Sequence, residues 1–119
     1  MGNIISKYDF FSNPIRIILN KKQLIMHYLI IARDYPNGLE NRQKHRPAHL
    51  EYGEKLKKEG KLLYAVAILK EGAMAGSVMV MNFESTKELE NWKANEPYIT
   101  GKVWEDVEIT ECAIPPLFR

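Results

Sequence analysis

A short, almost continuously apolar segment at residues 26–33 places the strongest constraint on how this chain folds. It reads Met-His-Tyr-Leu-Ile-Ile-Ala-Arg and is rich in β-branched and aromatic residues, which predicts a strand buried on both faces. Residues 34–38 then supply strong turn chemistry, so the strand ends there. A buried strand requires a sheet, and the rest of the chain has to supply it.

A polar helix follows the turn and is expected to stop at Gly60, a residue type that suits the position after a helix end. Its start can be read in two ways. Pro47 favours the first helical turn, which places the start near Arg46. Alternatively, the helix begins near Leu39 and tolerates Pro47 with a bend. The face expected to point at the sheet carries His45, His49, Tyr52 and Leu56.

Two further strands are predicted at residues 61–70 and 77–84. The connection between them, residues 71–76, has glycine at both ends and predicts a β-hairpin. Ser85 and Glu88 have capping-box spacing and predict the start of a second helix, which should end before Pro97.

Residues 97–101 are predicted to turn the chain into a last strand at residues 104–114, where apolar and polar residues alternate. The resulting βαββαβ order predicts a ferredoxin-like α+β fold: a four-stranded antiparallel sheet with two helices on one face. The other face needs cover. The same face of a second copy is the natural cover, so we expect a homodimer.

The length of 119 residues fits one domain, which we divide into an N-terminal extension (1–25), a folded domain (26–114) and a C-terminal tail (115–119). The net charge of +2 argues against a nucleic-acid partner. Cys112 is the only cysteine, which excludes an intrachain disulfide and fits a cytoplasmic location. No zinc-like spacing occurs, and we expect no metal or cofactor. The longest apolar run, residues 62–69, is too short to span a bilayer.

Residues 1–7 match the N-myristoylation pattern, with Gly2 exposed after removal of Met1 and Ser6 at the required offset. Four nearby basic residues would add the electrostatic signal that a single acyl chain needs. A membrane partner is expected only if Gly2 is acylated. The alternative is that residues 1–25 are a loose extension, or that Met26 is the true start.

Several segments together resemble the YCII-related family (YciI-like proteins). They are residues 28–34, 46–50 (Arg-Pro-Ala-His-Leu), 76–78, Trp92, 96–98, Gly101 and 103–105. The resemblance implies a dimeric α+β barrel with its two sheets face to face. It also implies an active site built on a His and an Asp, which would fall on His49 and Asp34. The chain departs from the family in having Glu96 where many relatives have Asp, and residues 65–68 where many have Gly-Pro.

An imidazole held in one tautomer by a carboxylate can take or give a proton near neutral pH. We therefore expect acid–base chemistry by His49 and Asp34, such as an elimination or lyase-like step on a small organic molecule. Arg33, Arg46 or Tyr98 would orient an anionic or phenolic group of that substrate. The alternatives are a structural histidine bonded to a backbone carbonyl, an Asp34 that only shapes a turn, and a non-catalytic dimeric ligand-binding or accessory module.

Overall fold

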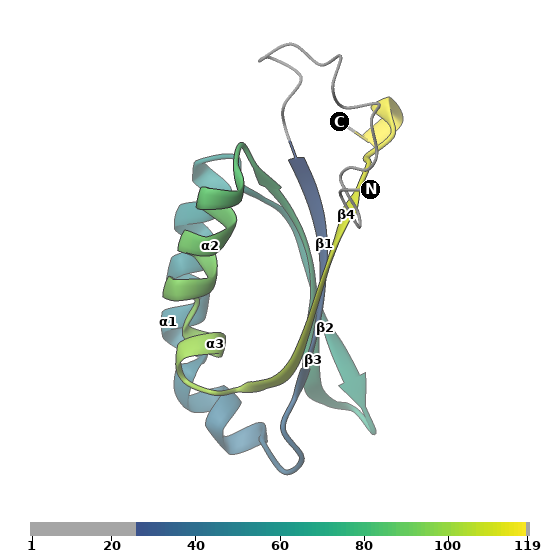
Figure 1. Cartoon of the computed structure of the whole chain (residues 1–119). Helices are drawn as coiled ribbons and strands as arrows, with labels where there is room; N and C mark the ends of the chain where they lie inside the picture. Colours follow the sequence, from purple (N-terminus) through teal and green to yellow (C-terminus); the bar gives the residue numbers. More distant parts are fainter. Residues whose placement is uncertain (1–25, 119) are drawn as a thin grey trace, which may run out of the picture.

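The computed structural model describes residues 26–118, which form one four-stranded sheet with helices on one side (Figure 1). The strands are all antiparallel and lie in the order β2-β3-β1-β4. This confirms the predicted ferredoxin-like α+β fold. In chain order, the elements are β1 (Met26–Asp34), α1 (Leu39–Lys58), β2 (Leu62–Lys70), β3 (Ala73–Phe83), α2 (Thr86–Asn95), α3 (Pro97–Thr100), β4 (Trp104–Cys112) and a 3₁₀ turn at Pro116–Phe118.

Helix α1 begins at Leu39 and carries Pro47 inside it, so the longer of the two readings of the sequence is right. The helix ends as predicted, because Gly60 adopts a left-handed conformation with φ of 76°. The amide of Gly60 bonds to the carbonyl of Lys57, and the amide of Lys61 bonds to that of Leu56. This pair of bonds is the Schellman arrangement, which satisfies the last carbonyls of the helix.

The hairpin turn between β2 and β3 is shorter than predicted. Strand β3 begins at Ala73, where we expected loop until Ser77. Glu71 and Gly72 alone make the turn, with φ values of 52° and 83°. Two consecutive left-handed residues match the right-handed twist of the flanking strands, which allows pairing to continue up to the turn.

Helix α2 has the predicted N-cap, since the Ser85 hydroxyl accepts the Glu88 amide. Residues 97–101 were predicted to turn the chain, whereas Pro97 in fact begins the single-turn helix α3. The fixed φ of proline suits the first helical position. The Glu96 side chain caps this helix by accepting the Tyr98 amide.

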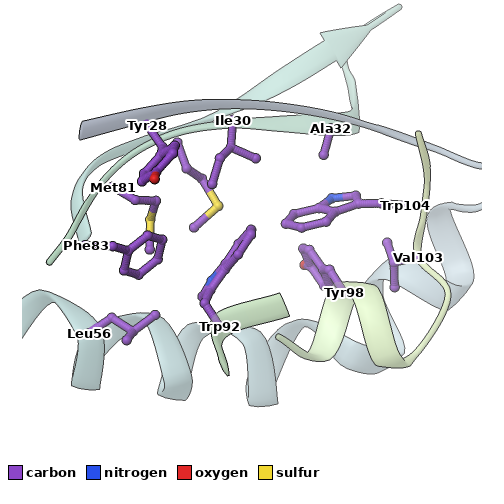
Figure 2. Close-up of a cluster of buried hydrophobic side chains, with 11 residues drawn as sticks. Tyr28, Ile30, Ala32, Leu56, Met81, Phe83, Trp92, Tyr98, Val103 and Trp104 are labelled. Carbon is purple, nitrogen blue, oxygen red and sulfur yellow. The ribbon is translucent and has the colours of Figure 1, made fainter. Parts of the chain in front are cut away.

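The core fills the space between the sheet and the helices (Figure 2). Because successive strand residues alternate in direction, Tyr28, Ile30 and Ala32 of β1 all point into it. The prediction that β1 is buried on both faces is wrong for the described chain. Leu29 and Ile31 are only half-buried, since no helix covers their side of the sheet.

The uncovered face of the sheet is apolar. Val66 pairs with Val78 and Tyr64 pairs with Val80, so all four point away from the helices. Tyr64 is 69% exposed and Val66 48% exposed. Of the helices in residues 26–118, none has the length and apolar character needed to cross a bilayer.

Candidate functional site

The candidate site forms where α3 packs against the inward face of α1. Arg42 and His49 are both on α1 and lie two turns, or about 10 Å, apart along the helix axis. The Tyr98 ring from α3 fits between them. It stacks on the His49 imidazole with 3.8 Å between centroids and 7° between planes. The Arg42 guanidinium carbon lies 4.8 Å from the centre of the same ring.

Glu96 orients His49. The Nδ1 atom of His49 lies 2.6 Å from Oε2 of Glu96, whose side chain is 1% exposed. When Nδ1 carries the hydrogen of this short bond, Nε2 carries the lone pair. Nε2 has no hydrogen-bond partner among the described residues and is not one of their fully buried polar atoms. It is therefore the nitrogen that can exchange a proton with a substrate.

The same Glu96 oxygen also accepts the Tyr98 amide at 2.9 Å. One carboxylate thus fixes the tautomer of His49 and caps the helix that carries Tyr98. Burial raises the pKa of the Tyr98 phenol, while the positive charges of Arg42 and Arg46 oppose that rise. The Tyr98 ring has no exposed surface, so the described state is closed around it.

Arg42 is a buried arginine with a second set of partners. Its Nη1 donates to both carboxylate oxygens of Asp34, at 2.9 and 3.2 Å, and its Nη2 donates to the Ser77 hydroxyl at 3.0 Å. Burial raises the pKa of the Asp34 carboxyl, and the Arg42 guanidinium works in the opposite direction. This pair ties the end of β1 to α1 and β3.

The predicted hydrogen bond between His49 and Asp34 is not formed. His49 bonds to Glu96 and Asp34 bonds to Arg42. The sequence placed both groups in the right region, because Asp34 still acts on the Tyr98 phenol through its charge. It assigned the wrong carboxylate to the imidazole.

The three residues predicted to orient a substrate are placed differently from one another. Tyr98 lies against His49, and Arg46 is exposed on α1 but close enough for its charge to act on Tyr98. Arg33 is exposed and alternates with the buried Ala32, so it points to the uncovered face of the sheet, away from His49. Gly2 lies outside the described residues.

Sequence reasoning missed three residues of this site: Glu96, Arg42 and Ser77. A signal existed for two of them. Arg42 sits three residues before His45 on the inward face of the helix, where a charged residue requires a partner. Glu96 was noticed only as a departure from the family pattern. Ser77 had no signal of its own.

Two further features of residues 26–118 bear on where a site could lie: possible metal ligands and a surface hollow. Within residues 26–118, no group of three or more His, Cys, Asp or Glu side chains could hold a metal ion. A hollow of about 470 Å³ lies between the C-terminal half of α1 and α2, and its lining does not include His49. Its charged lining consists of lysine and glutamate side chains such as Lys61 and Glu88, which pair with each other at 3.5 Å.

Comparison with known proteins agrees with this architecture. The sequence pattern of the YCII-related domain matches residues 26–113. An uncharacterized protein of Haemophilus influenzae is 36% identical over 89 residues, covering 69% of this chain and 91% of the relative. Protein YciI of Escherichia coli is 36% identical over 91 residues, covering 71% and 93%.

Among solved structures, a 5-chloro-2-hydroxyhydroquinone dehydrochlorinase from Burkholderia phenoliruptrix, in complex with 2,5-dihydroxybenzoquinone, is similar with a TM-score of 0.70 and 26% identity. The match covers 79% of this chain and all of that one. A protein from Agrobacterium tumefaciens shares the fold alone, with a TM-score of 0.52 and 12% identity over 78% of this chain and 96% of that one.

Proposed function

Because this chain belongs to the YCII-related family, we propose that it is a small cofactor-independent enzyme in which Nε2 of His49 moves a proton on a small organic molecule. The observation that carries this proposal is the 2.6 Å contact between Nδ1 of His49 and the buried Glu96 carboxylate. A general base needs one free nitrogen, a fixed orientation and a group that stabilises the protonated ring. Glu96 fixes the orientation of the imidazole and can stabilise its protonated form, and it leaves Nε2 free.

The proposed reaction is an elimination or lyase-like step. Nε2 removes a proton from a C–H or O–H group of the substrate, the electron pair of that bond forms a new double bond, and the leaving group departs with its own bonding pair. In a chlorinated hydroquinone, ketonisation of the ring first makes the chlorine-bearing carbon tetrahedral, so that chloride leaves from an sp³ carbon and the product is a quinone. The Glu96 carboxylate stabilises the imidazolium that results. Positioned acid–base groups contribute about 10²- to 10⁴-fold to a rate. The similarity to a dehydrochlorinase supports this class, since loss of HCl is an elimination.

The first test compares His49→Asn with a control, His45→Asn, one helical turn earlier on α1. The substrates are chlorinated hydroquinones such as 5-chloro-2-hydroxyhydroquinone, and the readout is chloride release. Wild type and His45→Asn should release chloride at the same rate, whereas His49→Asn should lose at least about 100-fold. If wild type and His49→Asn behave alike with every compound, the non-catalytic ligand-binding module becomes the better account.

We also propose that the functional unit is a homodimer joined through the uncovered face of the sheet. Tyr64 and Val66 project from this face while remaining 69% and 48% exposed, and Leu29, Ile31, Val78 and Val80 continue the apolar surface. A contiguous apolar face of this kind marks an interaction surface. The same face of a second copy is complementary to it by symmetry.

A further inference from the structure

Hydrogen-bond donors without acceptors gather in the core beside the candidate site. Five buried side-chain polar atoms have no partner among the described residues, and four of them carry a hydrogen. These four are Arg42 Nε, Tyr98 Oη, Trp92 Nε1 and Trp104 Nε1. Buried polar groups normally have hydrogen-bond partners, so four buried donors without acceptors require an explanation.

The four donor residues form a series in which each lies beside the next. The Arg42 guanidinium lies 4.8 Å from the centre of the Tyr98 ring, and Tyr98 meets Trp104 edge-on at 5.5 Å. Trp104 in turn lies 6.3 Å from Trp92. Figure 2 shows the three aromatic rings lying together between the sheet and the helices. The side chains that carry these donors therefore form one cluster, and Tyr98 of that cluster stacks on His49.

The chemistry of this region defines what fits it. Aromatic neighbours favour a flat ring, which can meet them edge-on. Guanidinium, phenol and indole groups that lack an acceptor favour a ligand oxygen that accepts hydrogen bonds. A ligand that offered only donors would leave these groups unpaired and gain nothing from them.

We infer that Tyr98 and Arg42 form a subsite for an acceptor oxygen on a planar ring, either a quinone carbonyl or a phenolate. The inference rests on the proposed function, because the bound ring would present its reacting carbon to Nε2 of His49. The Tyr98 hydroxyl and the Nε–H of Arg42 donate to the oxygen, and Trp104 packs at the ring edge. Since Tyr98 has no exposed surface, the ligand enters only when α3 shifts away from α1.

The test measures binding alone, so it is independent of turnover. The probe is 2,5-dihydroxybenzoquinone, the molecule held by the similar dehydrochlorinase structure, titrated into the full-length protein by calorimetry. Hydroquinone serves as a ring of the same size without carbonyl acceptors. Wild type should bind the quinone at least tenfold more tightly than hydroquinone. The phenolate is tested with 4-nitrophenol, which should bind only above the pH at which its hydroxyl ionises.

Tyr98→Phe is the decisive variant because its effects on stability and on binding should differ. The hydroxyl has no partner among residues 26–118, so its removal should leave the urea midpoint unchanged or higher. The same variant should weaken quinone binding about tenfold, and a control at the exposed Tyr35, Tyr35→Phe, should bind like wild type. Removing Arg42 together with its partner Asp34, in Arg42→Met/Asp34→Asn, should weaken binding similarly.

Either of two results overturns the subsite: Tyr98→Phe binding the quinone as wild type does, or wild type failing to prefer the quinone over hydroquinone. These results do not depend on the proposed function. His49→Asn should retain quinone binding while losing turnover, so a failed turnover test and a failed binding test point to different errors.

Discussion

His49 and Glu96 are 47 positions apart in the chain, yet Nδ1 of one lies 2.6 Å from Oε2 of the other. This contact joins α1 to the segment between α2 and α3. The carboxylate that accepts from the imidazole also caps α3, which holds the Tyr98 ring flat against that imidazole. Orientation of the base and positioning of its nearest aromatic neighbour are therefore properties of a single side chain.

Glu96→Gln should disturb both properties. A glutamine amide can donate as well as accept, so it no longer specifies which nitrogen of His49 carries the hydrogen. We expect a mixture of His49 tautomers by ¹⁵N NMR and, because one buried group is left poorly paired, a loss of about 1–3 kcal/mol in the free energy of unfolding. Glu90→Gln, at an exposed residue of α2, should change neither quantity. Identical His49 spectra in wild type and Glu96→Gln would remove Glu96 from the proposed mechanism.

Arg42→Met should be among the most destabilising substitutions in the chain. It leaves the Asp34 carboxyl, whose side chain is 4% exposed, without its partner, and breaking a buried ion pair in this way costs about 3–5 kcal/mol. The double variant Arg42→Met/Asp34→Asn removes both charges and should recover part of that loss. Urea unfolding of the two single variants and the double variant measures the coupling. Simple additivity would show that the pair contributes no interaction of its own.

The fold was predictable because its signals are local. The apolar run at residues 26–33, the spacing of Ser85 and Glu88, and Gly60 after the first helix each act within a few residues of where they stand. One of the errors was also local. The hairpin turn was predicted too long because Glu71 adopts a left-handed conformation, which is uncommon for glutamate and which its residue type does not predict.

The site was predictable only in part, because hydrogen-bond partners are chosen by tertiary packing. His49 was identified from its helix face and from the family resemblance. The sequence does not show whether Asp34 or Glu96 is its hydrogen-bond partner. Asp34 is nearer to His49 in the chain, but its carboxylate accepts hydrogen bonds from the buried Arg42 instead. The carboxylate that His49 contacts is that of Glu96, which caps the helix that Pro97 begins, where the sequence pattern predicted a turn.

The homodimer is tested by two substitutions of matched exposure. Val66 on the uncovered sheet face is 48% exposed and Leu50 on α1 is 50% exposed. Val66→Glu places a carboxylate in the proposed interface, where its burial without a partner would cost desolvation free energy. The variant should therefore shift the protein to monomers in sedimentation velocity. Leu50→Glu, on the helical side, should leave the dimer intact. A wild-type protein that sediments as a monomer at micromolar concentration would contradict the proposed interface.

Alkaline pH should destabilise the protein through Tyr28. Burial, reinforced by the Glu111 carboxylate, raises the pKa of this phenol from 10.0 to about 12. A group whose pKa is higher in the folded state stabilises the fold fully below its unfolded pKa and loses that contribution as pH rises through the folded value. The free energy of unfolding should therefore fall between pH 10 and pH 12, by about 2 kcal/mol for Tyr28. Urea unfolding across this range should show a shallower fall for Tyr28→Phe, whereas Tyr35→Phe, at an exposed tyrosine, should follow wild type. Parallel curves for Tyr28→Phe and wild type would assign the alkaline loss to other groups.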